Sequence, residues 1–376
     1  VGSEMCIRDR VNVLPADYQS AVDNGTAVFP KIDAGDYFSI ALKADGTVWT
    51  WGYNVAGQLG NNSTADSLIP VQVLGGATGN QYLTNVVQVA AGGTFDGGNR
   101  YYALALRENG TVWAWGRNDG GQLGNSNTKN QLLPVQVKGG ASGSEYLTDV
   151  VQVTAGNWHS MALKANGTVW SWGNNASGQL GLGYTGGMET EPRKVMSNIK
   201  KIAVGDNFVM ALDFDGHLWT WGVNNYGQLG QGLVTSVQLN TPQMIQSFVN
   251  NGLLVTDISV GGSGVDEFAL AITDTMDVYG WGKNYNGQIK SGSAGYILSP
   301  IYTGVSRAIA IAGGRNATSY SLAESGRVYA WGYNGSIEHG TSKLSTSVVA
   351  KSQVSINDKV VAIAAGYGSG FAITEN

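Results

Sequence analysis

The chain has 376 residues with 55 glycines and 11 tryptophans, and 13% of its residues are charged, against about 25% in an average globular protein. Its net charge of −5, with no cluster of lysine and arginine, excludes a general attraction to nucleic acid, and its single cysteine, Cys6, excludes an intramolecular disulfide and a thiolate zinc site. No apolar run reaches the roughly 18 residues of a membrane span. Many turn residues and few charges favour short β-strands over long surface helices.

The N-terminal part of the chain lies outside any repeat. Residues 1–10 (VGSEMCIRDR) resemble nothing else in the chain, and we interpret them as extraneous or disordered sequence. Residues 11–30 form a separate N-terminal segment. We therefore expect the folded domain to occupy residues 31–376.

A tryptophan–glycine pair recurs about every 50 to 60 residues, and a period of this size indicates a repeat architecture. The pairs begin at Trp51, Trp115, Trp172, Trp221, Trp281 and Trp331. Each follows an apolar phrase such as TAGNWHSMAL, which starts at Thr154, and the last such phrase starts at Ala364 with no tryptophan pair behind it. The sequence therefore contains six complete repeats and the start of a seventh.

Each repeat divides into four short strands. Asn109-Gly110 and Asn166-Gly167 lie between the second and third strands, and such pairs are a strong hairpin signal because both residues must adopt a positive φ. A proline recurs in the fourth strand, which should be outermost because proline cannot donate to a central ladder. These prolines are Pro70, Pro134, Pro192, Pro242 and Pro300. The pattern predicts an all-β fold, a seven-bladed β-propeller of four-stranded antiparallel blades with an incomplete last blade.

We expect the paired tryptophans to be structural. Residues two apart in a strand share a face, so Trp49 and Trp51 should point the same way, toward a neighbouring blade. Burying one indole of about 200 Å² stabilises a fold by at most roughly 5 kcal/mol. The tryptophans assigned to this role are Trp49, Trp51, Trp113, Trp115, Trp170, Trp172, Trp219, Trp221, Trp281 and Trp331. The repeat is then a building block, not an active site present in six copies.

Residues 155–181, AGNWHSMALKANGTVWSWGNNASGQLG, resemble the repeat of the regulator of chromosome condensation family, which reads AGxxHSLAL followed by GxVWxWGxNxxGQLG. The resemblance extends over about residues 31–376. It implies a seven-bladed propeller whose termini meet in one blade. The composition, rich in Asn, Gly and Thr and poor in Lys, is most similar to that of bacterial members, which implies a secreted or cell-surface protein.

The end of the sequence bears on ring closure. The chain finishes FAITEN at Asn376, whereas its internal counterpart LALREN, Leu104 to Asn109, is followed at once by Gly110 and a tryptophan strand. Either the sequence is a fragment, which we favour, or residues 11–30 close the ring by supplying part of the missing outer strands.

The loops after the AG glycines differ in length between repeats, and the fold does not demand these differences. The longest is GTFDGGNRYY in the second repeat, and the fifth and sixth repeats also carry insertions. Unequal loops on one face of a rigid ring can form a binding surface, on which aromatic and arginine side chains commonly dominate. The candidate partner contacts are Phe95, Asp96, Arg100, Tyr101, Trp158, Asp266, Glu267 and Arg315. The alternative is that the loops are tolerated insertions whose aromatic side chains pack on their own blade.

We expect no catalytic residues, no metal site and no cofactor. The three histidines fall in different repeats, which does not indicate a nucleophilic triad. His159 stands where other repeats have phenylalanine, so we expect a buried, hydrogen-bonded side chain. His217 is expected to be exposed in a turn. Glu338 beside His339 could form a weak metal or proton site, but degeneration of the repeat explains the pair more simply.

The sequence thus predicts a non-catalytic, monomeric propeller that binds a protein partner of unknown identity through variable loops on one face. Two alternatives stay open. One is guanine-nucleotide exchange on a small GTPase, which resemblance to the eukaryotic founder of the family implies, although the side chains required for exchange cannot be matched to positions in this sequence. The other is a carbohydrate-binding module that uses loop aromatics.

Overall fold

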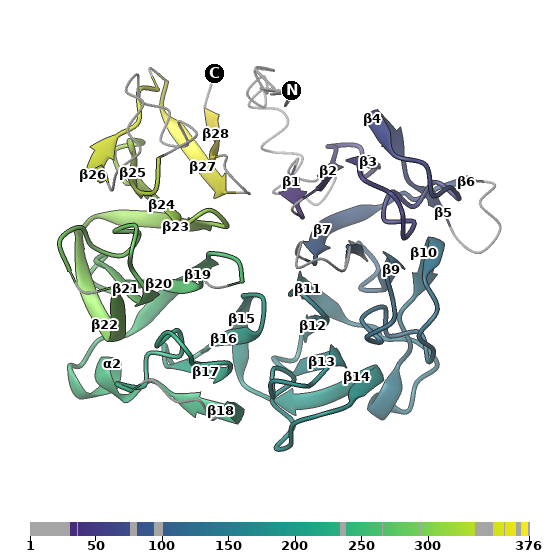
Figure 1. Ribbon diagram of the computed structural model, residues 1–376, viewed down its shortest axis with the longest axis horizontal. Coiled ribbons are helices and arrows are strands. Elements are labelled where there is room, and N and C mark those ends of the chain that lie inside the picture. Colours follow the sequence, from purple (N-terminus) through teal and green to yellow (C-terminus); the bar gives the residue numbers. More distant parts are fainter. Residues whose placement is uncertain are drawn as a thin grey trace.

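The structure is a computed structural model that describes residues 31–35, 37–75, 81–93, 101–233, 238–264, 266–293, 295–334, 349–356, 358–365 and 370–374. These residues form six four-stranded antiparallel sheets arranged as blades around a common axis, followed by a two-stranded sheet (Figure 1). The fold is therefore an all-β propeller. The described residues form six complete blades, not seven, and two further strands follow the sixth, where the sequence predicts an incomplete seventh blade. The segments 1–10 and 11–30 lie outside the described residues.

The blades follow the chain in order. Blade 1 contains β1 (Lys31–Ala34), β2 (Phe38–Leu42), β3 (Val48–Gly52) and β4 (Ser67–Gln72), and blade 2 contains β7 (Val86–Gly92), β8 (Tyr102–Arg107), β9 (Val112–Gly116) and β10 (Gln131–Gln136). Blade 3 contains β11 (Val150–Ala155), β12 (His159–Lys164), β13 (Val169–Asn174) and β14 (Met188–Met196), and blade 4 contains β15 (Ile199–Val204), β16 (Phe208–Asp213), β17 (Leu218–Gly222) and β18 (Leu239–Met244). Blade 5 contains β19 (Val255–Gly261), β20 (Phe268–Thr273), β21 (Val278–Lys283) and β22 (Tyr296–Val305), and blade 6 contains β23 (Ala308–Gly314), β24 (Thr318–Ala323), β25 (Val328–Gly332) and β26 (Val349–Gln353).

Smaller elements connect the blades. The two-stranded sheet consists of β27 (Val360–Ala365) and β28 (Gly370–Thr374), and the connections hold β5 (Leu74–Gly75), β6 (Gln81–Tyr82), the 3₁₀ turn η1 (Gly140–Ser142) and the short helix α2 (Gln246–Asn250). In each blade the first strand is innermost and the fourth strand is the outer edge. The recurring prolines all lie in these edge strands, where a missing N–H breaks no central ladder.

The antiparallel order of each blade gives the propeller two distinct faces. Connections from the first to the second strand and from the third to the fourth strand emerge on one side, which we call the loop face. Connections from the second to the third strand emerge on the opposite side, the hairpin face. In the hairpins with an Asn-Gly or Asp-Gly pair only the glycine has a positive φ, for example 74° at Gly110, so the expectation of positive φ at both turn residues is wrong. The asparagine instead accepts hydrogen bonds through its side chain, as Asn109 Oδ1 does from Thr111 N and Oγ1.

The second tryptophan of each pair lies between two blades. Trp115 is completely buried, belongs to one apolar cluster with Phe38 and Ile40 of blade 1, and donates from Nε1 to the backbone oxygen of Gln58 in blade 1 at 2.9 Å. The same hydrogen bond recurs from Trp172 to Gln122, from Trp221 to Gln179 and from Trp281 to Gln228. Each of these indoles therefore fills the junction with the preceding blade and satisfies its one donor there.

The first tryptophan of each pair is held differently. Trp49 and Trp219 are half-buried, and their Nε1 atoms donate within their own hairpins, to Thr47 Oγ1 and Asp213 Oδ2. Trp170 makes the same type of bond to Thr168 Oγ1. The two tryptophans share a strand face but differ in burial and in the blade that holds them.

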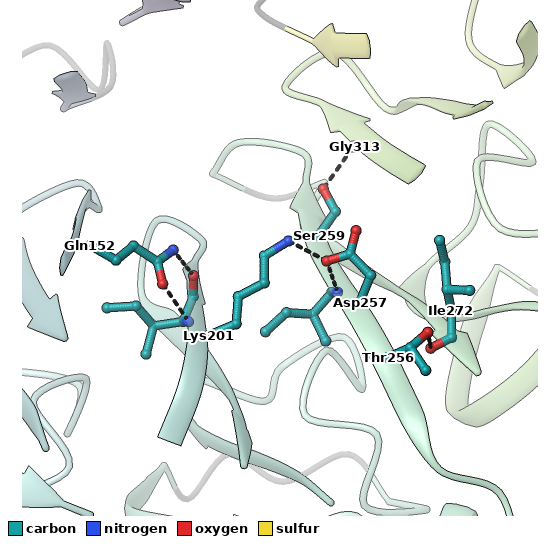
Figure 2. A network of polar contacts seen from close by, with 9 residues as sticks. Gln152, Lys201, Thr256, Asp257, Ser259, Ile272 and Gly313 are labelled. Atoms are coloured by element: carbon teal, nitrogen blue, oxygen red, sulfur yellow. Dashed lines mark hydrogen bonds and ion pairs between the residues drawn. The ribbon is translucent and has the colours of Figure 1, made fainter. Parts of the chain in front are cut away.

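The innermost strands surround a central cavity of about 250 Å³, lined by residues of β1, β7, β11, β15, β19, β23 and β27. Polar side chains link neighbouring inner strands around the ring. Gln152 of β11 bonds both the N–H and the oxygen of Ile202 on β15, Lys201 forms an ion pair with Asp257, and Gly313 N donates to Ser259 Oγ (Figure 2). These contacts join blades 3 to 6 at their inner ends.

Candidate partner-binding face

The loop face is built from connections that hydrogen-bond to one another around the mouth of the central cavity. Gly93 N of blade 2 donates to Gly156 O of blade 3, and Asn157 N donates to Asp206 O of blade 4. Gly262 N of blade 5 likewise donates to the oxygen of Gly314 in blade 6. The loops therefore form a connected belt, on which side chains not required by the fold can be held in fixed positions.

The structure places the predicted contact residues in different environments. Phe95, Asp96 and Arg100 lie outside the described residues. Tyr101 and Glu267 are buried, with exposed fractions of 0% and 1%, and neither reaches the surface. The loops fold their side chains inward because neighbouring blades offer apolar and hydrogen-bonding partners there.

The three remaining predicted residues are accessible in part. Trp158 is half-buried beside Gly120 of blade 2. Asp266 forms an ion pair with Lys283, at 2.8 Å between Oδ1 and Nζ. Arg315 of blade 6 donates from Nη1 to Gly93 O of blade 2 at 3.1 Å, so its side chain crosses the mouth of the cavity between non-adjacent blades. The described members of the predicted set are thus spread around the belt and do not form one compact site.

Tyr101 is the centre of an aromatic group between blades 1 and 2. The rings of Tyr37, Phe38 and Tyr53 have their centroids 6.0 to 6.1 Å from its ring. Tyr37 is 55% exposed at the edge of this group. Tyr101 therefore supports an exposed tyrosine from below.

A second aromatic group, which sequence reasoning missed, lies between blades 4 and 5 on the loop face. The ring of Tyr296 is stacked on that of Tyr226 with centroids 5.8 Å apart, and it meets Tyr285 edge-on at 5.2 Å. The ammonium of Lys283 lies 5.2 Å from the ring of Tyr226 and 5.5 Å from that of Tyr285. We call Tyr226, Tyr285, Tyr296 and Lys283 the tyrosine cluster.

The tyrosine cluster is partly open to solvent, with Tyr285 59% and Tyr296 39% exposed. Its signal in the sequence is weak, because the tyrosines come from two loops and the start of a strand. The position of Tyr285 holds Val55, Asp119, Ala176 or Asn225 in other blades. The fold thus places no demand on this side chain, which makes an exposed tyrosine there a functional candidate.

Glu267 takes part in a buried polar junction beneath this cluster. Its carboxyl group accepts hydrogen bonds from Asn207 N at 3.2 Å and from Gln228 Nε2 at 3.0 Å, both in blade 4. Asp206, itself 2% exposed, lies close enough to act on it electrostatically. Burial, together with the negative charge of Asp206, raises the pKa of Glu267 to about 8. Glu267 therefore holds its proton more tightly than an exposed glutamate does.

His159 is completely buried, as expected, but among the described residues neither of its ring nitrogens has a hydrogen-bond partner. Burial lowers the pKa of His159 to about 3, so the side chain is neutral at physiological pH. It occupies the position that Phe208 and Phe268 fill in blades 4 and 5. His159 thus acts as an aromatic filler and is not exposed to any substrate.

One group in the described part of the chain has the residue types of a metal site. Single ligand atoms of Asp213, Asp215 and His217, on the hairpin face, lie within 4.8 Å of one another. The Asp213 carboxylate already accepts from Trp219 Nε1 and from the backbone N–H groups of Asp215 and His217. His217 is not fully exposed in its turn, because its Nδ1 lies 3.3 Å from Asp213 Oδ2. The group is explained by closure of its own hairpin. The pair Glu338 and His339 lies outside the described residues.

No helix in the described ranges combines the length and apolar character needed to cross a bilayer.

Comparison with family models gives a consistent match. The model described as RCC1-like domain matches residues 81–376, and two models of the regulator of chromosome condensation (RCC1) repeat match residues 45–95 and 31–58. Together these matches include all the blades described above.

Among known proteins, the human E3 ubiquitin-protein ligase HERC2 is 30% identical over 337 residues, which cover 89% of this chain and 6% of HERC2. The ultraviolet-B receptor UVR8 of Arabidopsis thaliana is 31% identical over 314 residues, which cover 82% of this chain and 54% of UVR8. The chain therefore spans about half of UVR8 and a small part of HERC2.

Among solved structures, yeast RCC1 (Prp20) bound to Kap60 superimposes with a TM-score of 0.72 at 22% identity, covering 94% of this chain and 81% of Prp20. A second structure of Prp20, from Saccharomyces cerevisiae, gives a TM-score of 0.70 at 22% identity over 94% of this chain and 82% of that one, and was described with the binding of Prp20p to Gsp1p and histones. At this level of identity the likeness establishes the fold.

Proposed function

The chain belongs to the family of RCC1-like domains, and from this premise we propose that it is a non-catalytic propeller that binds a protein partner through its loop face. The observation that carries the proposal is the tyrosine cluster. Exposed tyrosines that pack on one another form a rigid contact surface, so their side chains lose little conformational entropy on binding. Tyrosine is also among the residues that dominate protein interfaces. The nearby ion pair of Asp266 with Lys283 adds polar groups at the rim of the same surface.

The relatives support a protein partner over a small substrate. Prp20 was solved with Kap60, and its binding to Gsp1p and histones was described. In this chain the buried His159 and Glu267 are enclosed in the fold, so neither is placed to act on a substrate. The low lysine content further supports a secreted or cell-surface protein of bacterial type, which a signal sequence in the full reading frame would test.

The proposal is tested by capture with matched variants. Immobilised wild type, Tyr285→Ala and Phe214→Ala are exposed to the same extract of the source organism, and retained proteins are quantified by mass spectrometry. Phe214 is a suitable control because it is 60% exposed on the hairpin face. We expect at least one protein to be retained by wild type and Phe214→Ala and lost on Tyr285→Ala. Equal retention by all three, or loss on Phe214→Ala alone, would contradict the proposal.

Guanine-nucleotide exchange is the second candidate, because resemblance to the founder of the family implies it. The test is release of fluorescently labelled GDP from a panel of purified small GTPases. If the wild-type chain accelerates the release of GDP, its activity would be nucleotide exchange and not simple binding. Binding to a glycan array would instead favour carbohydrate recognition by the loop aromatics.

We also propose that the ring has a seventh blade, of which the β27–β28 sheet forms the first two strands, and that residues 11–30 contribute to its outer strands. Elsewhere the outer strand of one blade packs on a loop glycine of the blade before it, as Leu132 does on Gly57. The equivalent Leu68 is 81% exposed, and Ile69 next to it is 70% exposed. Deletion of residues 1–30 should lower the unfolding temperature and increase acrylamide quenching of tryptophan fluorescence; no change in either would contradict this closure.

A further inference from the structure

Two tyrosines lie at the ends of the loop that joins β21 to β22. Tyr285 comes two residues after Lys283, the last residue of β21, and Tyr296 is the first residue of β22. Their ring centroids are 5.2 Å apart with an interplanar angle of 78°, so the edge of one ring meets the other ring. The fold therefore brings two phenol rings into direct contact although 10 residues separate them in the sequence.

The hydroxyl ends of these two rings also meet. A hydrogen bond with the side chain of Tyr285 raises the pKa of Tyr296 above its usual value. Because the hydroxyl is the only polar group of a tyrosine side chain, this bond joins the two phenol oxygens. The ring carbons ortho to each hydroxyl flank these oxygens and are brought close together with them. Tyrosyl radicals combine at these ortho carbons.

Both rings are accessible and both are held in place. Tyr285 is 59% exposed and Tyr296 is 39% exposed, so an oxidant in solution can reach each of them. Tyr296 is stacked on Tyr226 at 5.8 Å, and the Lys283 ammonium lies 5.5 Å from the ring of Tyr285. Reacting groups that are held side by side combine much faster than the same groups free in solution, because they need not find each other by diffusion.

We propose that Tyr285 and Tyr296 are a site of oxidative crosslinking, at which a haem peroxidase with hydrogen peroxide joins the two rings as dityrosine. Each phenol loses one electron and one proton to the oxidant, and one molecule of hydrogen peroxide is reduced to two molecules of water. The two radicals form a carbon–carbon bond between their ortho carbons. The hydrogen on each of these carbons then moves as a proton to the phenol oxygen, which restores both aromatic rings and both hydroxyl groups.

The crosslink closes the loop from residue 285 to residue 296 covalently. Like a disulfide, it restricts the unfolded chain, and it also fixes Tyr285 within the tyrosine cluster. Its consequence for partner binding rests on the proposed function. Formation of the crosslink itself depends on no partner.

Peptide mapping after mild oxidation tests the proposal. The purified chain is treated with a haem peroxidase and limiting hydrogen peroxide, and the monomer is recovered from a denaturing gel and digested with trypsin. Cleavage after Lys283, Lys290 and Arg307 places Tyr285 in peptide 284–290 and Tyr296 in peptide 291–307. We expect mass spectrometry to find these two peptides joined, with a mass two hydrogen atoms below their sum. The joined peptides should show the fluorescence of dityrosine.

Three variants identify the reacting rings. Tyr285→Phe and Tyr296→Phe keep an aromatic ring but remove the phenol, and each should lower the yield of the joined peptides about tenfold or more. Tyr302→Phe is the matched control, because Tyr302 lies in the same peptide as Tyr296 and is also 39% exposed, while its ring lies 6.1 Å from that of Tyr279. This variant should retain the crosslink at the yield of wild type.

Absence of the joined peptides from the wild-type monomer, or their loss in Tyr302→Phe, would overturn the proposal. Dityrosine that forms only between chains would do the same. So would a crosslink that joins peptide 291–307 only to peptide 202–283, which contains Tyr226 and Tyr279. Formation of the expected crosslink together with failure to capture a partner would overturn the proposed function alone.

Discussion

The junctions in the middle of the chain differ from those at its ends, although the same tryptophan position is used in both. At the middle junctions the indole is fully buried and donates to a glutamine carbonyl of the preceding blade, as Trp172 does to Gln122. Trp51 in blade 1 is only half-buried, and Trp331 in blade 6 is buried while its Nε1 has no acceptor in the described part of the chain. The contribution of a repeated residue to stability therefore depends on the neighbouring blade as much as on the repeat itself.

The largest expected effect is at a middle junction. Trp172→Ala should lower the free energy of unfolding by about 3 to 5 kcal/mol, because it leaves a cavity between blades 2 and 3 and removes the bond to Gln122. Urea denaturation followed by circular dichroism measures this. A loss below about 1 kcal/mol would mean that the indole does not support the junction.

The same substitution in blade 1 sharpens the comparison. Trp51→Ala should cost about 1 to 2 kcal/mol, since less apolar area is removed from a half-exposed site. Both variants are measured under identical conditions. A cost equal to that of Trp172→Ala would show that Trp51 is covered as completely as the middle tryptophans.

His159 distinguishes blade 3 from the blades that have phenylalanine at this position. Its folded pKa of about 3 lies below the usual value of 6.5, so the unfolded chain binds a proton that the folded one does not between these values. Stability should therefore decrease by about 1.4 kcal/mol per pH unit as the pH falls below 6.5. His159→Phe should reduce the slope by this amount, and an unchanged slope would show that the histidine is accessible to protons in the folded state.

The inner ends of the blades offer a smaller effect on stability than the middle tryptophan junctions. Gln152 bonds both backbone groups of Ile202, whereas Ala310 holds the equivalent position in blade 6. Gln152→Ala should therefore cost about 1 to 2 kcal/mol, while Ala310→Ser should be nearly neutral. Thermal unfolding of both variants measures the difference. If Ala310→Ser lowered stability as much as Gln152→Ala, the bonds of Gln152 to Ile202 would not be the source of the stabilisation.

The repeat was accessible from the sequence because its signals are local. A strand with tryptophans two residues apart, an Asn-Gly hairpin and a proline in the edge strand each depend on neighbours within a few residues. The burial of Glu267 was not predictable in this way, because Asn207 and Gln228, which bond it, lie on two loops of another blade.

The candidate site shows the same limit. Tyr226 and Tyr296 are 70 positions apart in the numbering, and only the packing of blades 4 and 5 stacks them. Loop length directed attention to the loop face of the propeller but not to the tyrosine cluster, whose loops have the ordinary length of the repeat. The structure thus adds the contacts between blades, which no single repeat encodes.

The most direct test of the account measures binding and stability on the same samples. For a partner captured as described, the account predicts that Tyr285→Ala raises the dissociation constant about tenfold or more and changes the free energy of unfolding by less than about 0.5 kcal/mol. Phe214→Ala, on the hairpin face, should change neither. An unchanged dissociation constant in Tyr285→Ala, with weaker binding in Phe214→Ala, would contradict the assignment of recognition to the loop face.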